Sequence, residues 1–201
     1  MMHNVEALLL AAGESTRMGR LKALLPWTGG QPLLRYQIDQ LMQSPVDRIV
    51  VVLGHRRDEL RTLLPADARV VAVENPQYGT GKVSSIIAGV SAIPAGRHVL
   101  ILAVDQPRPA WLIQRVLAAH LEHGAPITVA GHDGRRGHPV IFAPSLRDEL
   151  LRLEEATQGL RAVLARHASA VQVIETDTPL ALLNLNTPDD YEAARRLAGL
   201  E

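Results

Sequence analysis

The sequence contains no cysteine and few aromatic residues, and each lack narrows the classes of protein that it can encode. Without cysteine, disulfide bonds, thiolate metal sites and cysteine nucleophiles are all excluded. Aromatic residues make up only 3% of the chain although 47% of it is hydrophobic, so the core has to consist mainly of aliphatic side chains. Such a composition is typical of helices packed on a buried parallel sheet.

The chain also lacks net charge and long apolar runs. Lysine plus arginine number 21, as do aspartate plus glutamate, so no global field favours nucleic acid or an anionic membrane as a partner. The longest apolar stretches, 7–12 and 99–104, are far shorter than the roughly 20 residues that span a bilayer. The first residues lack the basic segment of a signal peptide. We expect a soluble, cytoplasmic protein.

In the first half of the chain, short apolar runs alternate with helical patterns. The predicted strands are 5–10, 48–53, 70–73 and 99–104. The predicted helices are 32–42, 57–64, 83–93 and 109–123. This alternation predicts right-handed β-α-β units and a Rossmann-like, three-layer α/β/α fold with a mainly parallel sheet.

The second half is less regular. The predicted strands are 127–130, 139–142, 171–174 and 181–185, with a polar loop over 132–138. The predicted helices are 145–153, 159–167 and one that begins at Thr187, where a capping threonine precedes a proline and two acids. Since no repeat or linker is evident, we expect one nucleotidyltransferase domain over 1–201, with nucleotide bound by about 1–107 and acceptor by about 108–201.

Ligands of such folds bind at the carboxyl ends of the strands, which directs attention to the loop after the first strand. Gly13 in this loop leaves room for a ligand, and its backbone N–H groups can form an anion-binding concavity. Arg17 can clamp phosphate oxygens, and Lys22 can place a compact charge beside a phosphorus atom. The loop is neither a P-loop nor a dinucleotide fingerprint, because neither glycine spacing is present.

Asp105 ends the buried run 99–104. A buried charge costs several kcal/mol unless it is paired or bound to metal, so this aspartate is a candidate Mg²⁺ ligand. A turn aspartate before a proline is an equally good interpretation of the residue alone.

Taken in order, these segments resemble the molybdenum cofactor cytidylyl- and guanylyltransferases, a family of MobA-like NTP transferases, and more distantly the sugar-phosphate nucleotidyltransferases. The first loop carries the resemblance through Ala11-Ala12-Gly13-x-Ser15-x-Arg17-Met18-Gly19-x-x-Lys22. It continues through Asn75-Pro76-x-Tyr78-x-x-Gly81-x-x-Ser84-Ser85, Asp105-Gln106-Pro107, Gly137-His138-Pro139-Val140 and Asn184-x-Asn186-Thr187-Pro188-Asp189-Asp190.

The resemblance implies roles for these residues. Lys22, Arg17 and Asp105 are implied as the catalytic set, with Asp105 holding Mg²⁺. Asn186 stands where many relatives have a second aspartate, so direct metal ligation, a water-mediated contact and a turn-shaping role all stay open. The implied nucleotide-binding set comprises Leu10, Ala11, Ala12, Gly13, Arg17, Lys22, Asn75, Gly81, Ser85 and Asp105.

The base and the acceptor are less determined. Ala12 before Gly13 resembles the cytidylyl-type members, whereas Asn184-x-Asn186 resembles the guanylyl-type members, and we favour CTP over GTP. His138, Asn184 and Asn186 are the candidate acceptor-binding residues, and Arg135 and Arg136 are candidates to meet the acceptor phosphate.

We therefore expect a Mg²⁺-dependent enzyme that transfers a nucleoside monophosphate from an NTP to a phosphorylated acceptor, molybdopterin by resemblance, and releases pyrophosphate. Two alternatives remain. One is a nucleotidyltransferase for a sugar phosphate or another small molecule. The other is a nucleotide-binding regulator or chaperone of a molybdoenzyme, which would have that enzyme as its partner.

Overall fold

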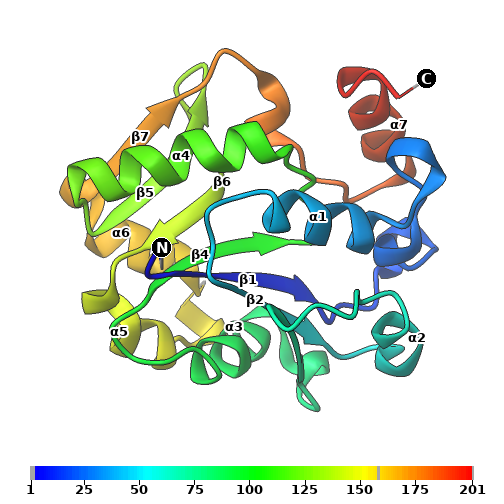
Figure 1. Ribbon diagram of the computed structural model, residues 1–201, viewed down its shortest axis with the longest axis horizontal. Helices are drawn as coiled ribbons and strands as arrows, with labels where there is room; N and C mark the ends of the chain where they lie inside the picture. Colours follow the sequence, from blue (N-terminus) through cyan, green and yellow to red (C-terminus); the bar gives the residue numbers. More distant parts are fainter. Residues whose placement is uncertain (1–2, 158, 201) are drawn as a thin grey trace.

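The fold is a single seven-stranded sheet with helices on both faces, as seen in a computed structural model that describes residues 3–157 and 159–200 (Figure 1). The strands are β1 (Val5–Ala11), β2 (Arg48–Leu53), β3 (Val70–Glu74), β4 (His98–Ala103), β5 (Ile127–His132), β6 (Arg135–Phe142) and β7 (Val171–Glu175). The helices are α1 (Leu33–Met42), α2 (Arg57–Arg61), α3 (Lys82–Ser91), α4 (Ala110–His123), α5 (Arg147–Leu151), α6 (Leu160–Arg166) and α7 (Pro188–Leu197).

The strand order confirms the predicted α/β class. It runs β3-β2-β1-β4-β6-β5-β7, and every neighbouring pair is parallel except the two that involve β6. Leu10 pairs with Val52 of β2 on one side and with Ala103 of β4 on the other. The loops that follow β1, β2 and β4 therefore emerge at the same edge of the sheet.

Side chains of the central strand β1 point alternately into two hydrophobic cores, one on each face of the sheet. Leu9 points into the core beneath α1 and α4, whereas Leu8 points into the core on the opposite face, beneath α3, α5 and α6 (Figure 1). Gly89 lets α3 approach the sheet closely, because a Cβ at this position would lie 2.1 Å from Cδ1 of Leu8. The aliphatic composition is thus used to pack helices tightly on both faces of a buried sheet.

Two predictions for the second half of the chain are wrong. The polar segment 132–138 is not a loop throughout, because β5 and β6 form a hairpin that turns at Asp133 and Gly134. The segment 181–185 is not a strand: it begins in a 3₁₀ helix, η8 (Pro179–Leu182), and continues as extended loop. Proline lacks the N–H that a sheet ladder needs, and the Thr178 side chain accepts from Leu180 N–H and starts the turn.

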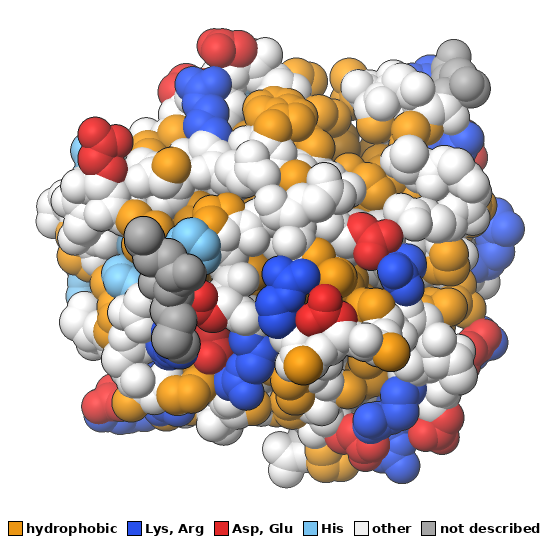
Figure 2. Space-filling view, in the orientation of Figure 1, with side chains coloured by type: hydrophobic (Ala, Val, Ile, Leu, Met, Phe, Trp, Pro, Cys, Tyr) orange, Lys and Arg blue, Asp and Glu red, His pale blue; other side chains and the backbone are white. Residues whose placement is uncertain are grey.

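The other differences concern element ends. The predicted helix 57–64 is shorter, as α2, and the predicted helix 145–153 is α5 preceded by the short 3₁₀ helix η5 (Pro144–Leu146). No helix in the described part of the chain is long and apolar enough to cross a membrane. On the face shown in Figure 2, acidic and basic side chains are interspersed, as expected for a chain without net charge.

Candidate active site

The loop that follows β1 is held in shape by its own side chains. Ser15 adopts a left-handed backbone conformation with φ of 59°, and its hydroxyl accepts a hydrogen bond of 3.0 Å from Lys22 N–H. Gly13 is exposed, and a Cβ there would meet no atom within 4 Å, so the space in front of the loop is open. Met18 and Trp27 are buried, in agreement with the packing expected of a methionine and a tryptophan near such a loop.

Because β1 and β4 are neighbours, this loop reaches Asp105, which follows β4. Lys22 Nζ lies 2.8 Å from Asp105 Oδ2. Lys22 is buried, at 8% exposure, and the carboxylate is partly shielded, so the pair attracts in a medium less polar than water. The structure thus brings the predicted catalytic lysine and the predicted metal ligand into direct contact.

A third segment, in front of α7, completes this cluster. Asn186 Oδ1 accepts from Arg17 Nη2 at 3.2 Å and from Lys22 Nζ at 3.5 Å. The backbone of Asn186 is held in place by Asp190. The N–H groups of Asn186 and Thr187 both donate to Asp190 Oδ2, at 3.1 and 2.9 Å. The Thr187 hydroxyl in turn accepts from Asp190 N–H, so the predicted helix start is confirmed as a capping box. The Lys22 ammonium group therefore contacts two oxygen atoms, one from the charged Asp105 carboxylate and one from the neutral Asn186 amide.

A cavity of about 300 Å³ lies beside this cluster, over the carboxyl ends of β1 and β4. Its lining includes five of the predicted nucleotide-binding residues outside the catalytic set, namely Leu10, Ala12, Gly13, Gly81 and Ser85. It also includes Ser15, Lys22, Tyr78, Lys82 and Asp105. This cavity, called the smaller cavity below, is therefore lined both by the loop after β1 and by the Lys22–Asp105 pair.

Asn75 lies behind this cavity and organises its wall. Its side chain is buried, and its amide donates to the hydroxyls of Ser84 and Ser85, both at 2.9 Å, while its carbonyl oxygen accepts from Gln77 N–H. Among the described residues, Asn75 is not part of the lining, whereas Ser85 is. Ala11 is likewise buried at the end of β1 and lies outside the lining.

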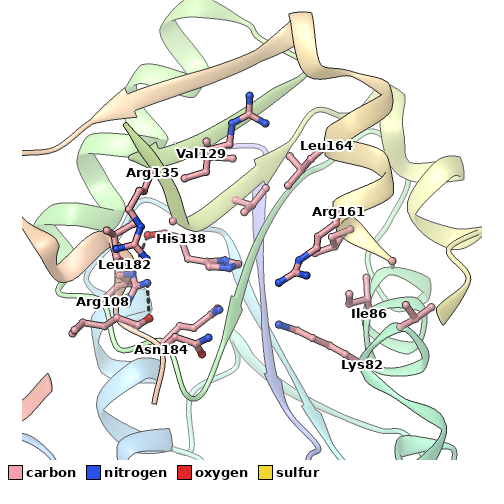
Figure 3. A pocket seen from close by; sticks show the side chains of 18 of the residues that line it. Lys82, Ile86, Arg108, Val129, Arg135, His138, Arg161, Leu164, Leu182 and Asn184 are labelled. Atoms are coloured by element: carbon pink, nitrogen blue, oxygen red, sulfur yellow. Dashed lines mark hydrogen bonds between the residues drawn. The ribbon is translucent and has the colours of Figure 1, made fainter. Parts of the chain in front are cut away.

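A second cavity, of about 830 Å³, opens between β6, α6 and the segment after η8 (Figure 3). His138 and Asn184, two of the predicted acceptor-binding residues, line it, and Arg135 and Arg136 do so as well. Asn186, the third, belongs instead to the cluster around Lys22. The larger cavity is therefore formed mainly by residues of the second half of the chain.

The His138 ring is electrically neutral at physiological pH. Burial, and after it the positive charges of Arg108 and Lys82, lower its pKa to about 3. Its Nδ1 is buried and has no hydrogen-bond partner among the residues that the structure describes. The ring itself points into the larger cavity (Figure 3).

Arg108 forms the floor of the larger cavity and is fully buried. Its guanidinium donates to four backbone carbonyls, those of Pro107, His138, Ala181 and Leu183, at 2.7 to 2.9 Å. Burial lowers the pKa of Arg108 to about 9, so it still carries its charge at neutral pH. These bonds hold β6 and the segment after η8 against the loop that carries Asp105.

Lys82, the first residue of α3, joins the two cavities. Among the described residues it alone lines both of them. Burial between the two cavities lowers the pKa of Lys82. The negative charge of Asp105 opposes this shift, whereas the positive charges of Lys22 and Arg161 add to it. Lys82 as a whole residue is nevertheless exposed.

Sequence reasoning missed three residues of this site: Lys82, Arg108 and Arg161. Lys82 does depart from the hydrophobic residue usual at its place in the resembling family, and that departure was a usable signal. Arg108 follows a proline and Arg161 lies on an ordinary amphipathic helix, and no local pattern distinguishes either of them. Their positions depend on contacts between distant parts of the chain.

Comparison with known proteins agrees with this geometry. Residues 7–171 match the family described as MobA-like NTP transferase domain. The chain is 28% identical over 195 residues to the molybdenum cofactor cytidylyltransferase of Escherichia coli K12, covering 96% of this chain and 97% of that protein. It is 29% identical over 194 residues to the molybdenum cofactor guanylyltransferase of Shewanella sediminis, covering 94% of each.

Solved structures are also similar. A homologue of Mycobacterium tuberculosis Rv0371c from Mycobacterium sp. strain JC1 superposes with a TM-score of 0.79 at 27% identity, covering 100% of this chain and 98% of that one. Rv0371c itself, solved as a complex with manganese, superposes with a TM-score of 0.72 at 25% identity, covering 94% and 97%.

Proposed function

Because the chain belongs to the family of MobA-like NTP transferase domains, we propose that it transfers CMP from CTP to the phosphate of molybdopterin and releases pyrophosphate. The observation that carries this proposal is the contact between Lys22 Nζ and Asp105 Oδ2, 2.8 Å apart, in the lining of the smaller cavity. We assign the smaller cavity to the nucleotide and the larger one to the acceptor, within one domain over 1–201.

A divalent metal fits the residues around Lys22. The Asp105 carboxylate and the Asn186 carbonyl oxygen both face a single ammonium group, which shows that this spot suits positive charge. Hard oxygen ligands of this kind are those that Mg²⁺ prefers, and it usually takes only one or two carboxylates from a protein. Asp105 would hold the ion, and Asn186 would contact it directly or through water. When bound, the ion would neutralise part of the triphosphate charge.

The chain's own residues supply the rest of the mechanism. Arg17 and Lys22 stabilise the negative charge that grows on the phosphate oxygens and on the departing pyrophosphate. The acceptor phosphate forms a new P–O bond with the α-phosphorus as the bond to the β-phosphate bridging oxygen breaks. Since a phosphate monoester is largely ionised at neutral pH, no general base is required.

The choice of CTP over GTP is supported by the form of the smaller cavity. Ala12 lines it beside Gly13, at the place where the guanylyl-type members tend to have a second, smaller residue, glycine. A pyrimidine needs less room than a purine, so we expect CTP to be the better substrate.

The test is to incubate the protein with Mg²⁺, molybdopterin and either CTP or GTP and to measure pyrophosphate release. We expect release with CTP to exceed that with GTP. Lys22→Ala and Asp105→Ala should each lower the rate by roughly 100-fold or more, since each removes a group that stabilises developing charge. Arg35→Ala, a surface change on α1, is the control and should keep the wild-type rate. Unchanged rates in both site variants would refute the mechanism.

A further inference from the structure

Lysine is used at only two positions in this chain, Lys22 and Lys82, while arginine provides all the other basic side chains except histidine. Both lysines line the smaller cavity. Lys22 is paired with Asp105 at 2.8 Å. Lys82 has no ion pair with a carboxylate among the described residues, and it is turned toward the larger cavity (Figure 3). The second lysine is therefore a free cation at the junction of the two cavities.

Arg161, on α6, and Lys82, on α3, extend into the larger cavity from the same side (Figure 3). Figure 3 shows both side chains directed into the same space, opposite His138 and Asn184. The structure gives Arg161 no carboxylate partner among the residues that it describes. The two positive charges repel each other, and a phosphate anion placed between them would reduce that repulsion.

The acid in the lining of the larger cavity already accepts a backbone hydrogen bond. Glu155 also lines the larger cavity, and its Oε2 accepts a hydrogen bond of 2.9 Å from Val83 N–H, at the start of α3. The carboxylate thus occupies the amino-terminal end of α3. An anionic ligand in this cavity has to be bound by side chains instead of by the backbone of that helix.

We infer that Lys82 and Arg161 bind the acceptor's phosphate monoester and place it beside the α-phosphate of the nucleotide. The inference rests on the proposed function, in which the larger cavity holds the acceptor. Lys82 is suited to this task because it alone, among the described residues, lines both cavities, and a phosphate held by it lies at their junction. Arg135 and Arg136, the candidates from the sequence, extend from the far wall, on β6, and do not line the smaller cavity.

The pair would act as positioning and charge-neutralising groups. Two phosphate-bearing reactants repel each other, and fixed cations between them lower the cost of bringing the attacking oxygen close to phosphorus. The neutral ring of His138 faces the same space and adds no charge of its own.

Because the chain has two lysines, a protein labelled with ¹³C-lysine gives two sets of side-chain signals that NMR can follow separately. The protein is saturated with Mg²⁺ and a CTP analogue whose α–β bridge is a methylene group, and is then titrated with inorganic phosphate as the probe. The Lys82 signals, assigned with Lys82→Met, should shift in a saturable way. The Arg161→Gln protein should bind phosphate at least tenfold more weakly than wild type. Its affinity for the CTP analogue should stay within twofold of the wild-type value.

Arg152→Gln is the matched control, because Arg152 is an exposed arginine after α5, outside the lining of both cavities, and should leave phosphate binding unchanged. The inference is overturned if phosphate leaves the Lys82 signals in place, or if Arg161→Gln binds phosphate as wild type does. Since the titration needs no turnover, it is independent of the pyrophosphate assay. Phosphate binding without nucleotidyl transfer would reject the proposed function, whereas transfer without phosphate binding at Lys82 would reject only this inference.

Discussion

Single buried polar side chains decide much of the local structure around the cleft. Arg108 is the clearest case, because it satisfies four carbonyls from three separate segments and, among the described residues, forms no hydrogen bond with a carboxylate. Buried polar groups of this kind specify one arrangement, since each carbonyl left without a donor costs roughly 1–3 kcal/mol. The same reasoning applies to the buried histidine on the helix that packs against β5.

His120 gives a testable pH dependence. It is fully buried on α4 and hydrogen-bonds to His98 Nδ1 and to the Thr128 hydroxyl, both at 2.8 Å. Burial, and then the neighbouring His98, lower its pKa to about 4. The unfolded chain therefore binds more protons between about pH 6.5 and 4, and stability falls as the pH falls through this window.

The unfolding free energy of wild type should fall when the pH is lowered from 7 to 5. In His120→Gln we expect this fall to be smaller by about 2 kcal/mol, because the buried histidine is gone. Urea denaturation at the two pH values measures this difference. His123→Gln is the control, since His123 lies exposed on the same helix, and it should retain the wild-type dependence. An equal loss in all three proteins would contradict the prediction.

At the scale of elements, the start of α7 connects helix stability to the catalytic cluster. Asp190 accepts from the N–H groups of Asn186 and Thr187, and the Thr187 hydroxyl closes the capping box. The side chain of Asn186 then reaches Lys22 and Arg17. The helix cap is therefore also the support of a residue at the proposed metal site.

Thr187→Val should lower the unfolding free energy by about 1 kcal/mol, because it removes the side-chain acceptor for Asp190 N–H. Nucleotidyl transfer should also become slower at a temperature where the protein stays folded, since Asn186 loses its fixed position. Thermal unfolding and the pyrophosphate assay measure the two effects. Thr62→Val, at the exposed end of α2, is a control of the same size and should keep the wild-type rate; an equal rate for Thr187→Val would argue against the support role.

At the scale of the whole molecule, positive charge is concentrated in the larger cavity, although the chain has no net charge. The larger cavity is lined by five lysine and arginine residues and by a single acid, Glu155. Figure 2 shows that both signs are mixed elsewhere on the face it presents. This charge would attract a phosphorylated ligand to the larger cavity.

Two adjoining cavities predict that both substrates bind before chemistry. We expect initial velocities measured at several CTP and acceptor concentrations to give intersecting double-reciprocal lines. Labelled pyrophosphate should not exchange into CTP when the acceptor is absent, because no covalent nucleotidyl-enzyme forms in the proposed direct transfer. Parallel lines together with such exchange would contradict a ternary complex.

The sequence by itself determined those features that depend on neighbours along the chain. Apolar runs and helical spacing predicted β1 to β4 and the helices between them, and Thr187 with the residues after it predicted the start of α7. The contact between Lys22 and Asp105 was also predictable, because the carboxyl ends of parallel strands meet at one edge of a sheet.

Only the tertiary structure decided the second half and the cleft. The insertion of β6 between β4 and β5, antiparallel to both, and the 3₁₀ turn at 179–182 depend on pairing and hydrogen bonds between segments far apart in the chain. The same is true of the Arg108 contacts and of the entry of Lys82 and Arg161, from two separate helices, into one cavity. No local pattern encodes such proximity, because it results from how the whole chain packs.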